Sequence, residues 1–261
     1  MVEVSRHEPG SFSWAELATS DPAAARSFYS SLFGWSAVDS PMGPEPDDVY
    51  TRMQFGGKDV AALYRIMKDQ AAMGVPPHWM CYVTVASADA SAAKARQLGG
   101  KLLAEPFDVA TYGRMAIIQD PEDAVLAVWQ PRDHTGIGRI NEPGALCWCE
   151  LATRNPDSAA RFYTQLFGWG LKSSPGYTEL TRGGTPIGGL FPMGPEMSGV
   201  PPYWTIYFQV TACDAAVTKA KSLGGRPLFG PKDVEGVGRF AMIQDPQGAA
   251  LSVIQLESTR L

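Results

Sequence analysis

The sequence lacks the features of a membrane-spanning or nucleic-acid-binding protein. It has no run of about eighteen apolar residues, the length that a spanning helix needs. No run of Lys and Arg reaches five residues, and 27 acidic residues outnumber 22 basic ones to give a net charge of -5. A basic face that follows a phosphate backbone is therefore not expected. We expect neither a membrane nor a nucleic acid as a partner.

Cysteine and histidine are also scarce, with 4 and 3 residues in a chain of 261. Four cysteines are too few to staple domains of this size, so we expect buried free thiols. The segment Met1–Phe12 is polar and lacks the apolar centre of a signal peptide, which indicates a cytoplasmic protein. Hydrophobic residues make up 45% of the chain, enough for an ordinary core, and this excludes a disordered protein.

The chain contains two copies of one segment. Residues 14–35 read WAELATSDPAAARSFYSSLFGW, and residues 148–169 read WCELATRNPDSAARFYTQLFGW, at an offset of 134. Later motifs repeat at an offset of 125, because the second copy has a deletion near the loop Ser40–Asp48. Such self-similarity is typical of a duplicated domain. We therefore expect two domains, at 10–132 and 144–257, joined by a linker.

Each copy reads as a strand, a helix and three strands, followed by the same pattern again. After a strand at 12–17, Asp21 is a typical N-cap residue and Pro22 suits the first helical position. Apolar residues then recur at helical spacing until Gly34, which ends the helix. Further strands are expected at 35–39, 49–55, 59–65, 79–85, 102–107, 114–119 and 125–130, with a second helix that stops at Gly99.

Four βαβββ units in two copies resemble the vicinal oxygen chelate superfamily, which includes glyoxalases, bleomycin-resistance proteins and extradiol dioxygenases. The resemblance rests on an ordered set of segments, each found again in the second copy: Asp21–Tyr29, Leu32–Trp35, Leu98–Gly100, Gln119–Pro121 and Val125–Gln130. It implies an α+β fold of two tandem glyoxalase-like domains, each of two βαβββ units that form a half-open barrel around a cavity. The tandem form looks most like glyoxalase-like proteins of actinobacteria.

Metal-using members of this family hold a divalent metal with His, Glu or Gln on the first and last strands of each unit. Non-ligating residues stand at those positions here: Trp14, Ala62, Met80 and Ala127 in the first copy, and Trp148, Gly189, Thr205 and Ser252 in the second. None of the three histidines is repeated between the copies. The resemblance therefore implies a site without a metal, and we expect no cofactor.

The predicted cavity walls combine tryptophan with small side chains, which suits a flat or apolar small molecule. We expect all eight of these residues to contact a ligand. Glu16 and Glu150 each follow a tryptophan by two positions, so they lie on the same strand face. Each glutamate is either a polar anchor or general base for the ligand, or a structural carboxylate.

Three further residues are candidate ligand contacts. Arg114 and Arg239 begin matched strands, where they either neutralise the glutamates, hold an anionic ligand group, or lie solvated at the strand end. His78, two residues before Met80, either lies at the surface or points toward the cavity mouth.

These residues favour a protein that binds a small, aromatic or apolar organic molecule in metal-free cavities, for sequestration or for tailoring of a metabolite. The alternative is an enzyme of this family, a lyase, isomerase or hydroxylase-like protein, that uses Glu16 or Glu150 as a base or uses displaced metal ligands. A third interpretation is a protein that binds a partner through its surface. Because duplication supplies both domains in one chain, a monomer or a homodimer is expected.

Overall fold

The computed structural model describes residues 3–43 and 48–257. The first copy contains β1 (Phe12–Thr19), α1 (Pro22–Phe33), β2 (Ser36–Pro41), β3 (Val49–Phe55), β4 (Lys58–Arg65), α2 (Lys68–Ala72), β5 (His78–Thr84), α3 (Ala88–Gln97), β6 (Lys101–Val109), β7 (Gly113–Gln119) and β8 (Val125–Pro131). The second copy contains β9 (Leu146–Thr153), α4 (Pro156–Phe167), β10 (Gly170–Ser174), β11 (Tyr177–Arg182), β12 (Thr185–Pro192), the 3₁₀ turn η1 (Pro195–Met197), β13 (Tyr203–Gln209), α5 (Cys213–Ser222), β14 (Arg226–Val234), β15 (Gly238–Gln244) and β16 (Ala250–Leu256).

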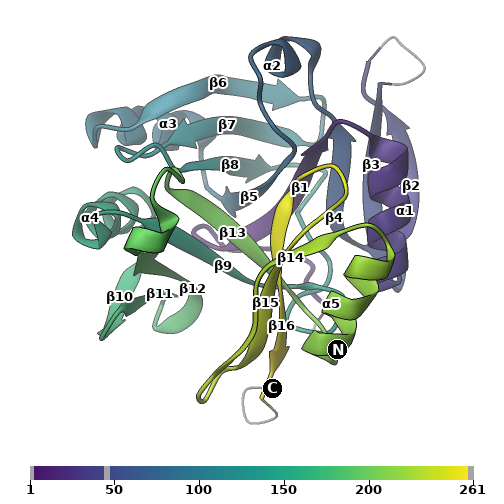
Figure 1. Ribbon diagram of the computed structural model, residues 1–261. Helices are drawn as coiled ribbons and strands as arrows, with labels where there is room; N and C mark the ends of the chain where they lie inside the picture. Colours follow the sequence, from purple (N-terminus) through teal and green to yellow (C-terminus); the bar gives the residue numbers. More distant parts are fainter. Residues whose placement is uncertain (1–2, 44–47, 258–261) are drawn as a thin grey trace.

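These elements form two eight-stranded sheets, one from each copy (Figure 1). The strand order is β2-β3-β4-β1-β5-β8-β7-β6 in the first sheet and β10-β11-β12-β9-β13-β16-β15-β14 in the second. In each unit the helix crossover makes the first strand pair in parallel with the fourth, as β1 does with β4, while β1 and β5 join the two units antiparallel. The predicted α+β fold of two tandem domains with four βαβββ units is confirmed.

The first helix of each copy begins and ends where its sequence predicts. The Asp21 side chain accepts a hydrogen bond from the backbone N–H of Ala24, and Gly34 ends α1 at φ +76°. In the second copy Asn155 and Gly168 do the same for α4. The short helix α2 was not predicted. Most of the deletion in the second copy falls between β10 and β11; its counterpart, the loop Ser40–Asp48, lies in part outside the described residues, at 44–47.

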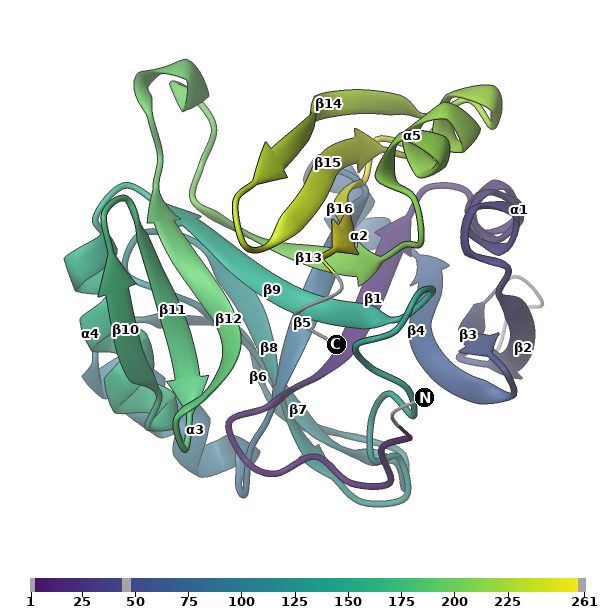
Figure 2. The ribbon, with the colours of Figure 1, turned by 90° about the horizontal axis from the view of Figure 1, so that it is seen from below.

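The helices of the two copies pair crosswise. Both ribbon views place α1 beside α5 and α4 beside α3 (Figures 1 and 2), and these helices are in contact. The close approach is possible because glycine stands at the contact: a Cβ on Gly100 would lie 3.0 Å from the Phe162 ring, and one on Gly225 would lie 3.0 Å from the Phe28 ring. The Leu-Gly-Gly motif of each copy therefore makes room for the other copy. None of the described helices is long and apolar enough to cross a membrane.

Two buried hydrogen bonds join the copies at these helices. The Tyr29 hydroxyl of α1 donates to Asp245 Oδ2 over 2.9 Å, and the Tyr163 hydroxyl of α4 donates to Asp120 Oδ2 over 2.9 Å. Both aspartates use their other oxygen to accept backbone N–H groups of their own turns. Each first helix is thus bound to the last turn of the opposite copy.

A tryptophan also hydrogen-bonds each of these tyrosine hydroxyls. The indole N–H of Trp79 donates to the Tyr29 hydroxyl over 3.0 Å, and that of Trp204 donates to the Tyr163 hydroxyl over 2.9 Å. The surrounding faces of β5 and β13 are apolar, and Trp79 lies 5.5 Å from Phe208 of the opposite sheet, between ring centroids. The shared core therefore lies between the helix-bearing faces of the two sheets, and the concave faces remain available for a site.

We expect Tyr163→Phe to lower the free energy of unfolding by about 1–3 kcal/mol, because it leaves the buried Asp120 carboxylate one hydrogen bond short and the Trp204 indole N–H without its acceptor. Chemical denaturation measures the loss. The control is Tyr112→Phe, because Tyr112 is 51% exposed. Equal stability of the two variants would show that the hydrogen bond between the copies contributes nothing measurable.

Candidate functional site

Two rows of side chains cross the concave face of the second sheet. Residues that are register partners on neighbouring strands point to the same face, so each row shares one side of the sheet. One row consists of Glu179, Gly189, Glu150 and Thr205. The other row consists of Trp148, Tyr207, Ser252 and Met242. The structure thus brings together all five second-copy residues that were expected from the strand positions, Trp148, Glu150, Gly189, Thr205 and Ser252.

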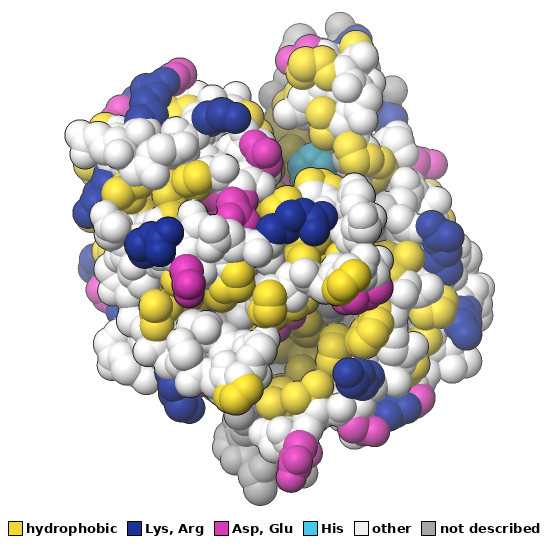
Figure 3. Space-filling model, turned by 60° about the vertical axis from the view of Figure 1, so that its left-hand side comes forward, with side chains coloured by type: hydrophobic (Ala, Val, Ile, Leu, Met, Phe, Trp, Pro, Cys, Tyr) yellow, Lys and Arg dark blue, Asp and Glu magenta, His cyan; other side chains and the backbone are white. Residues whose placement is uncertain are grey.

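The concave face of the second sheet borders an open cavity of about 1450 Å³. Trp148, Glu150 and Thr205 line it directly. Seven aromatic side chains contribute to the wall: Trp148, Tyr177, Phe191, Tyr203, Tyr207, Phe229 and Phe240. In the space-filling view, hydrophobic side chains gather in recesses between projecting parts of the surface (Figure 3). Such a wall provides stacking surfaces with a few polar atoms among them.

The Glu150 carboxylate is held by two tyrosines at the floor of this cavity. The Tyr207 hydroxyl donates to Glu150 Oε2 over 2.7 Å, and Tyr177 is a second hydrogen-bond partner. The indole N–H of Trp148 donates to the Tyr177 hydroxyl over 2.9 Å. Gly189 makes this arrangement possible, because a Cβ there would collide with the Tyr177 hydroxyl. Burial raises the pKa of Glu150, and the hydrogen bonds from the two tyrosines partly oppose that rise.

The first sheet repeats this network. The indole N–H of Trp14 donates to the Tyr50 hydroxyl over 3.0 Å, and the hydroxyls of Tyr82 and Tyr50 hydrogen-bond Glu16. Burial raises the pKa of Glu16 as it does that of Glu150. The other predicted first-copy residues share the concave face in the same two rows: Ala62 and Met80 are register partners of Glu16, and Ala127 is a partner of Tyr82.

The four tyrosines were missed by the sequence analysis. Tyr82 and Tyr207 carried a usable signal, because they match at the offset of 125 and follow Met80 and Thr205 by two positions. Tyr50 and Tyr177 match at neither of the two recognised offsets, because they come after the main deletion.

The linker covers the site of the first domain. The His134 ring lies edge-on against Trp14, with centroids 4.5 Å apart, and its carbonyl accepts the indole N–H of Trp129 over 2.9 Å. His134 Nε2 also lies 3.8 Å from Asp59 Oδ2. Ile137 is only 1% exposed, and its N–H donates to the carbonyl of Ser13. The segment expected to be a plain linker therefore packs against the first candidate site.

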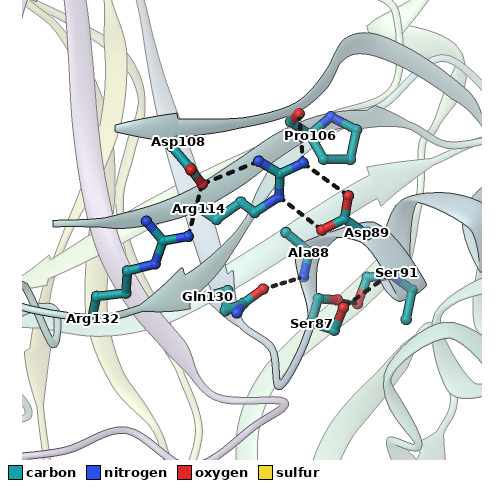
Figure 4. Close-up of polar contacts among 10 residues, drawn as sticks. Ser87, Ala88, Asp89, Ser91, Pro106, Asp108, Arg114, Gln130 and Arg132 are labelled. Carbon is teal, nitrogen blue, oxygen red and sulfur yellow. Dashed lines mark hydrogen bonds and ion pairs between the residues drawn. The ribbon is translucent and has the colours of Figure 1, made fainter. Parts of the chain in front are cut away.

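The two arginines point to the opposite side of their sheets. Arg114 makes a two-point contact with the Asp89 carboxylate of α3, and it also bonds Asp108 and the carbonyl of Pro106 (Figure 4). Side chains alternate between the two faces of a strand. The neighbouring residue Met115 is the register partner of Trp129 on the concave face, so Arg114 points to the other face. The guanidinium thus neutralises two aspartates of its own domain in place of Glu16.

Arg239 repeats this arrangement with Asp214 and Asp233, and it is not among the described residues that line the large cavity. His78, the other remaining candidate, is half-buried at the start of β5, where Nδ1 contacts the carbonyl of Pro76 over 2.8 Å. Its second-copy counterpart, Tyr203, lines the large cavity.

A divalent metal does not fit the donor atoms of this face. Within the described residues, no three His, Cys, Asp or Glu side chains come together as a ligand group. The register partners of Glu150 are Gly189 and Thr205, and its hydrogen-bond partners are the hydroxyls of Tyr207 and Tyr177, so neutral hydroxyls and not metal ligands surround the carboxylate. Hard cations and zinc take several carboxylate, imidazole or thiolate ligands. All four cysteines are free, and Cys147, which lines the cavity, has a pKa raised by burial.

Comparisons with known proteins agree with this architecture. A family model described as the Glyoxalase/Bleomycin resistance protein/Dioxygenase superfamily matches residues 11–128 and 145–253. The chain is 38% identical over 260 residues to a protein named "Putative glyoxylase CFP32" from Mycobacterium tuberculosis, covering 98% of both chains. It is 35% identical over 271 residues to the anthracycline biosynthesis protein DnrV from Streptomyces peucetius, covering 97% of this chain and 96% of the relative.

Two kinds of solved structure share the fold. The Mn(II)-bound glyoxalase from Novosphingobium aromaticivorans matches with a TM-score of 0.66 at 17% identity, over 95% of this chain and 83% of the other. A variant of homoprotocatechuate 2,3-dioxygenase from B. fuscum matches with a TM-score of 0.63 at 14% identity, over 98% and 74% of the two chains. At these identities the likeness concerns the fold alone.

We expect Glu150→Gln to change how stability depends on pH. A carboxyl whose pKa is raised on folding binds more protons in the folded state, so its contribution to stability falls as pH rises above its unfolded value of about 4.3. The variant lacks this loss. Its free energy of unfolding, relative to the unmodified protein, should therefore increase between pH 4 and pH 7, by about 1.4 kcal/mol for each pH unit by which folding raises the pKa of Glu150.

Denaturant titrations at several pH values measure this difference. Glu235→Gln, at an exposed position on the β14–β15 connection, is the control and should leave the pH profile unchanged. Parallel profiles for Glu150→Gln and the unmodified protein would contradict a raised pKa at Glu150.

Proposed function

Because the chain belongs to the glyoxalase/bleomycin resistance protein/dioxygenase superfamily, we propose that its second domain binds a flat, largely apolar organic molecule in the cavity beside Trp148, without a metal. The observation that carries this proposal is the composition of the cavity: aromatic side chains line it together with the Glu150 carboxylate, which tyrosine hydroxyls hold in place. Aromatic walls favour a ligand that stacks, and a fixed polar group helps to set its orientation.

The size of the cavity supports a ligand of several fused rings. At about 1450 Å³, the cavity exceeds the range of about 300–1,000 Å³ that accommodates most drug-sized molecules. One relative is named as an anthracycline biosynthesis protein, and anthracyclines are fused-ring aromatic compounds. Binding of such a molecule serves either its sequestration, as in the bleomycin-resistance branch, or its tailoring.

We assign the principal site to the second domain because the first is covered by its linker. The His134 ring occupies the face of the site beside Trp14, where a ligand would stack. Glu16 has equivalent tyrosine partners, Tyr82 and Tyr50, so the first domain retains the polar network of the site but not the open cavity above it.

We expect an anthraquinone to quench tryptophan fluorescence saturably, and Phe229→Ala to weaken its binding by about 1–2 kcal/mol through lost stacking and buried area. Titration of each variant with the same anthraquinone gives the dissociation constants. The matched control is Phe107→Ala: both phenylalanines lie about half-exposed on equivalent edge strands, β14 and β6, and Phe229 lines the cavity while Phe107 does not. An equal loss of affinity in both variants would place the ligand elsewhere.

A second candidate function is proton transfer, and the raised pKa of Glu150 favours it. A buried carboxyl that opens into an aromatic cavity is suited to act as a general base, and two tyrosine hydroxyls beside it are suited to stabilise a developing oxyanion. The step would move a proton from a carbon next to a ligand carbonyl to the Glu150 carboxylate. The protonated carboxyl would release the hydroxyl of Tyr207 or Tyr177, which would then donate its hydrogen bond to the enolate oxygen.

This step predicts exchange of that carbon-bound proton with deuterium when an enolisable aromatic ketone is incubated with the protein in heavy water. Glu150→Gln should abolish the exchange, followed by NMR, and should leave fluorescence quenching by the ketone within about threefold. If exchange continues at the original rate in Glu150→Gln, the carboxylate is not the base and the binding function alone remains.

A further inference from the structure

A second, smaller cavity of about 240 Å³ lies against one end of the second sheet. Its wall includes the starts of β9 and β12, at residues 146–149 and 185–187. The register between these parallel strands begins only at Glu150 and Gly189, so the cavity lies where the two strands have not yet paired. The N-terminal segment, the linker and the β11–β12 hairpin supply the rest of the wall.

The first copy closes the equivalent gap between β1 and β4 with its own backbone. The N–H groups of residues 137–138 donate to the carbonyls of Ser13 and Asp59 over 2.8 Å and 2.7 Å. The second-copy counterparts of these two acceptors, Cys147 and Pro186, line the cavity. Within the described part of the chain, no backbone N–H from outside the strands reaches either of their carbonyls. The gap therefore stays open in the second copy.

Arg182 stands at this gap where the first copy has Phe55. Both residues end a strand before a tight turn, since Phe55 pairs with Lys58 and Arg182 pairs with Thr185. The Phe55 ring packs against Gly144, where a Cβ would lie 3.3 Å from it. The second copy thus has a cation at the position where the first has an apolar ring.

The Arg182 guanidinium has no partner among the described residues. It forms no hydrogen bond or ion pair with any of them, and its Nε is buried without an acceptor. No Asp or Glu belongs to the described lining of the cavity. Burial lowers the pKa of His7, the other basic residue of the lining, so His7 is neutral at neutral pH. The cavity therefore carries one uncompensated positive charge, and a buried donor without an acceptor is unfavourable.

Apolar side chains form much of the remaining wall. They are Phe12, Ile140, Leu146, Trp148, Pro186 and Ile187. A guanidinium forms two parallel hydrogen bonds with a planar carboxylate, and the apolar wall suits a hydrocarbon group attached to it. One positive charge matches a monocarboxylate. The volume lies below the range of about 300–1,000 Å³ that drug-sized ligands occupy, which suits a molecule of one ring.

We propose that this cavity is a separate binding site for a small aromatic monocarboxylate, whose carboxylate pairs with Arg182 and whose ring lies against Phe12 and Ile187. The inference goes beyond the proposed function, because neither Glu150 nor Phe229 of the large cavity belongs to this wall. The two cavities are neighbours that share four lining residues, Asn141, Cys147, Trp148 and Pro186, so the experiment must distinguish them.

Benzoate and benzamide test the charge, because they have nearly the same shape and only benzoate is an anion. Titration calorimetry of the unmodified protein should show benzoate bound at least about tenfold more tightly than benzamide. Inorganic phosphate should bind more weakly than benzoate, because it lacks a ring for the apolar wall. This comparison tests the inference even if a variant does not fold.

Substitutions at Arg182 locate the site. Arg182→Gln should weaken benzoate binding at least about tenfold, and Arg182→Phe, which installs the residue of the first copy, should abolish it. Arg6→Gln is the control for charge, because Arg6 is 77% exposed on the same N-terminal segment. Phe229→Ala is the control for the large cavity, and both controls should leave the affinity for benzoate within about twofold.

The outcomes separate this site from the proposed function. Absence of benzoate binding, equal binding of benzamide, or an unchanged affinity in Arg182→Gln overturns the inference. Phosphate bound more tightly than benzoate also overturns it, because the cavity would then hold an inorganic oxyanion. Benzoate affinity that is lost in Phe229→Ala and kept in Arg182→Gln places the molecule in the large cavity and supports the proposed function alone. Failure of an anthraquinone to bind removes the proposed function and leaves this site intact.

Discussion

The hydrogen bonds that Tyr29 and Tyr163 make to aspartates of the opposite copy determine how the rest of the molecule is arranged. Each tyrosine lies on a helix of one copy, and its hydroxyl binds an aspartate, Asp245 or Asp120, in the last turn of the other copy. The tryptophans that share these hydroxyls place the apolar, helix-bearing faces against each other. Because that side of both sheets packs into the shared core, the candidate sites lie on the concave sides.

On the concave face, the tyrosines beside each glutamate fix the position of its carboxylate and influence its pKa. Tyrosine hydroxyls from two strands hold Glu150, and one of these tyrosines, Tyr177, passes over Gly189 of a third strand, so the carboxylate is fixed by its surroundings. A fixed, desolvated carboxylate can accept a hydrogen bond, pair with a charge or take up a proton. The aromatic wall around it is the reason that we propose a ligand with a flat apolar surface.

Much of the fold was predictable because local chemistry and tertiary structure agree in this chain. Asp21 and Gly34 cap the two ends of α1, as their residue types predict. The alternation of side chains along a strand places Trp148 and Glu150 on one face. The site was predictable only as far as single strands define it. Tyr177 lies on the β10–β11 hairpin, whose loop is shorter in the second copy, so its position could not be aligned with the first copy. Arg114 pairs with Asp89 of helix α3, which packs on the face of the sheet opposite to the site.

The structure of the linker could not be predicted from its composition. Its glycines and polar residues are typical of a mobile connection, yet Ile137 and the His134 ring find apolar and aromatic surface on the first sheet. Only the folded sheet presents that surface, so no local pattern announces the contact. The difference between one covered site and one open site therefore arises from tertiary packing and not from the duplicated residues.

The crosswise helix arrangement also has a consequence for how such a duplicated gene can change. A single copy on its own would expose the tyrosine hydroxyl, the aspartate and the glycine contact that the other copy completes, so the two halves are bound to each other as folding partners. A substitution at this interface therefore affects the stability of both copies. On the concave faces the copies have diverged: Arg52 stands in the first copy at the register position that Glu179 has in the second. Duplication in this form keeps the interface between the copies uniform and leaves the two concave faces free to diverge.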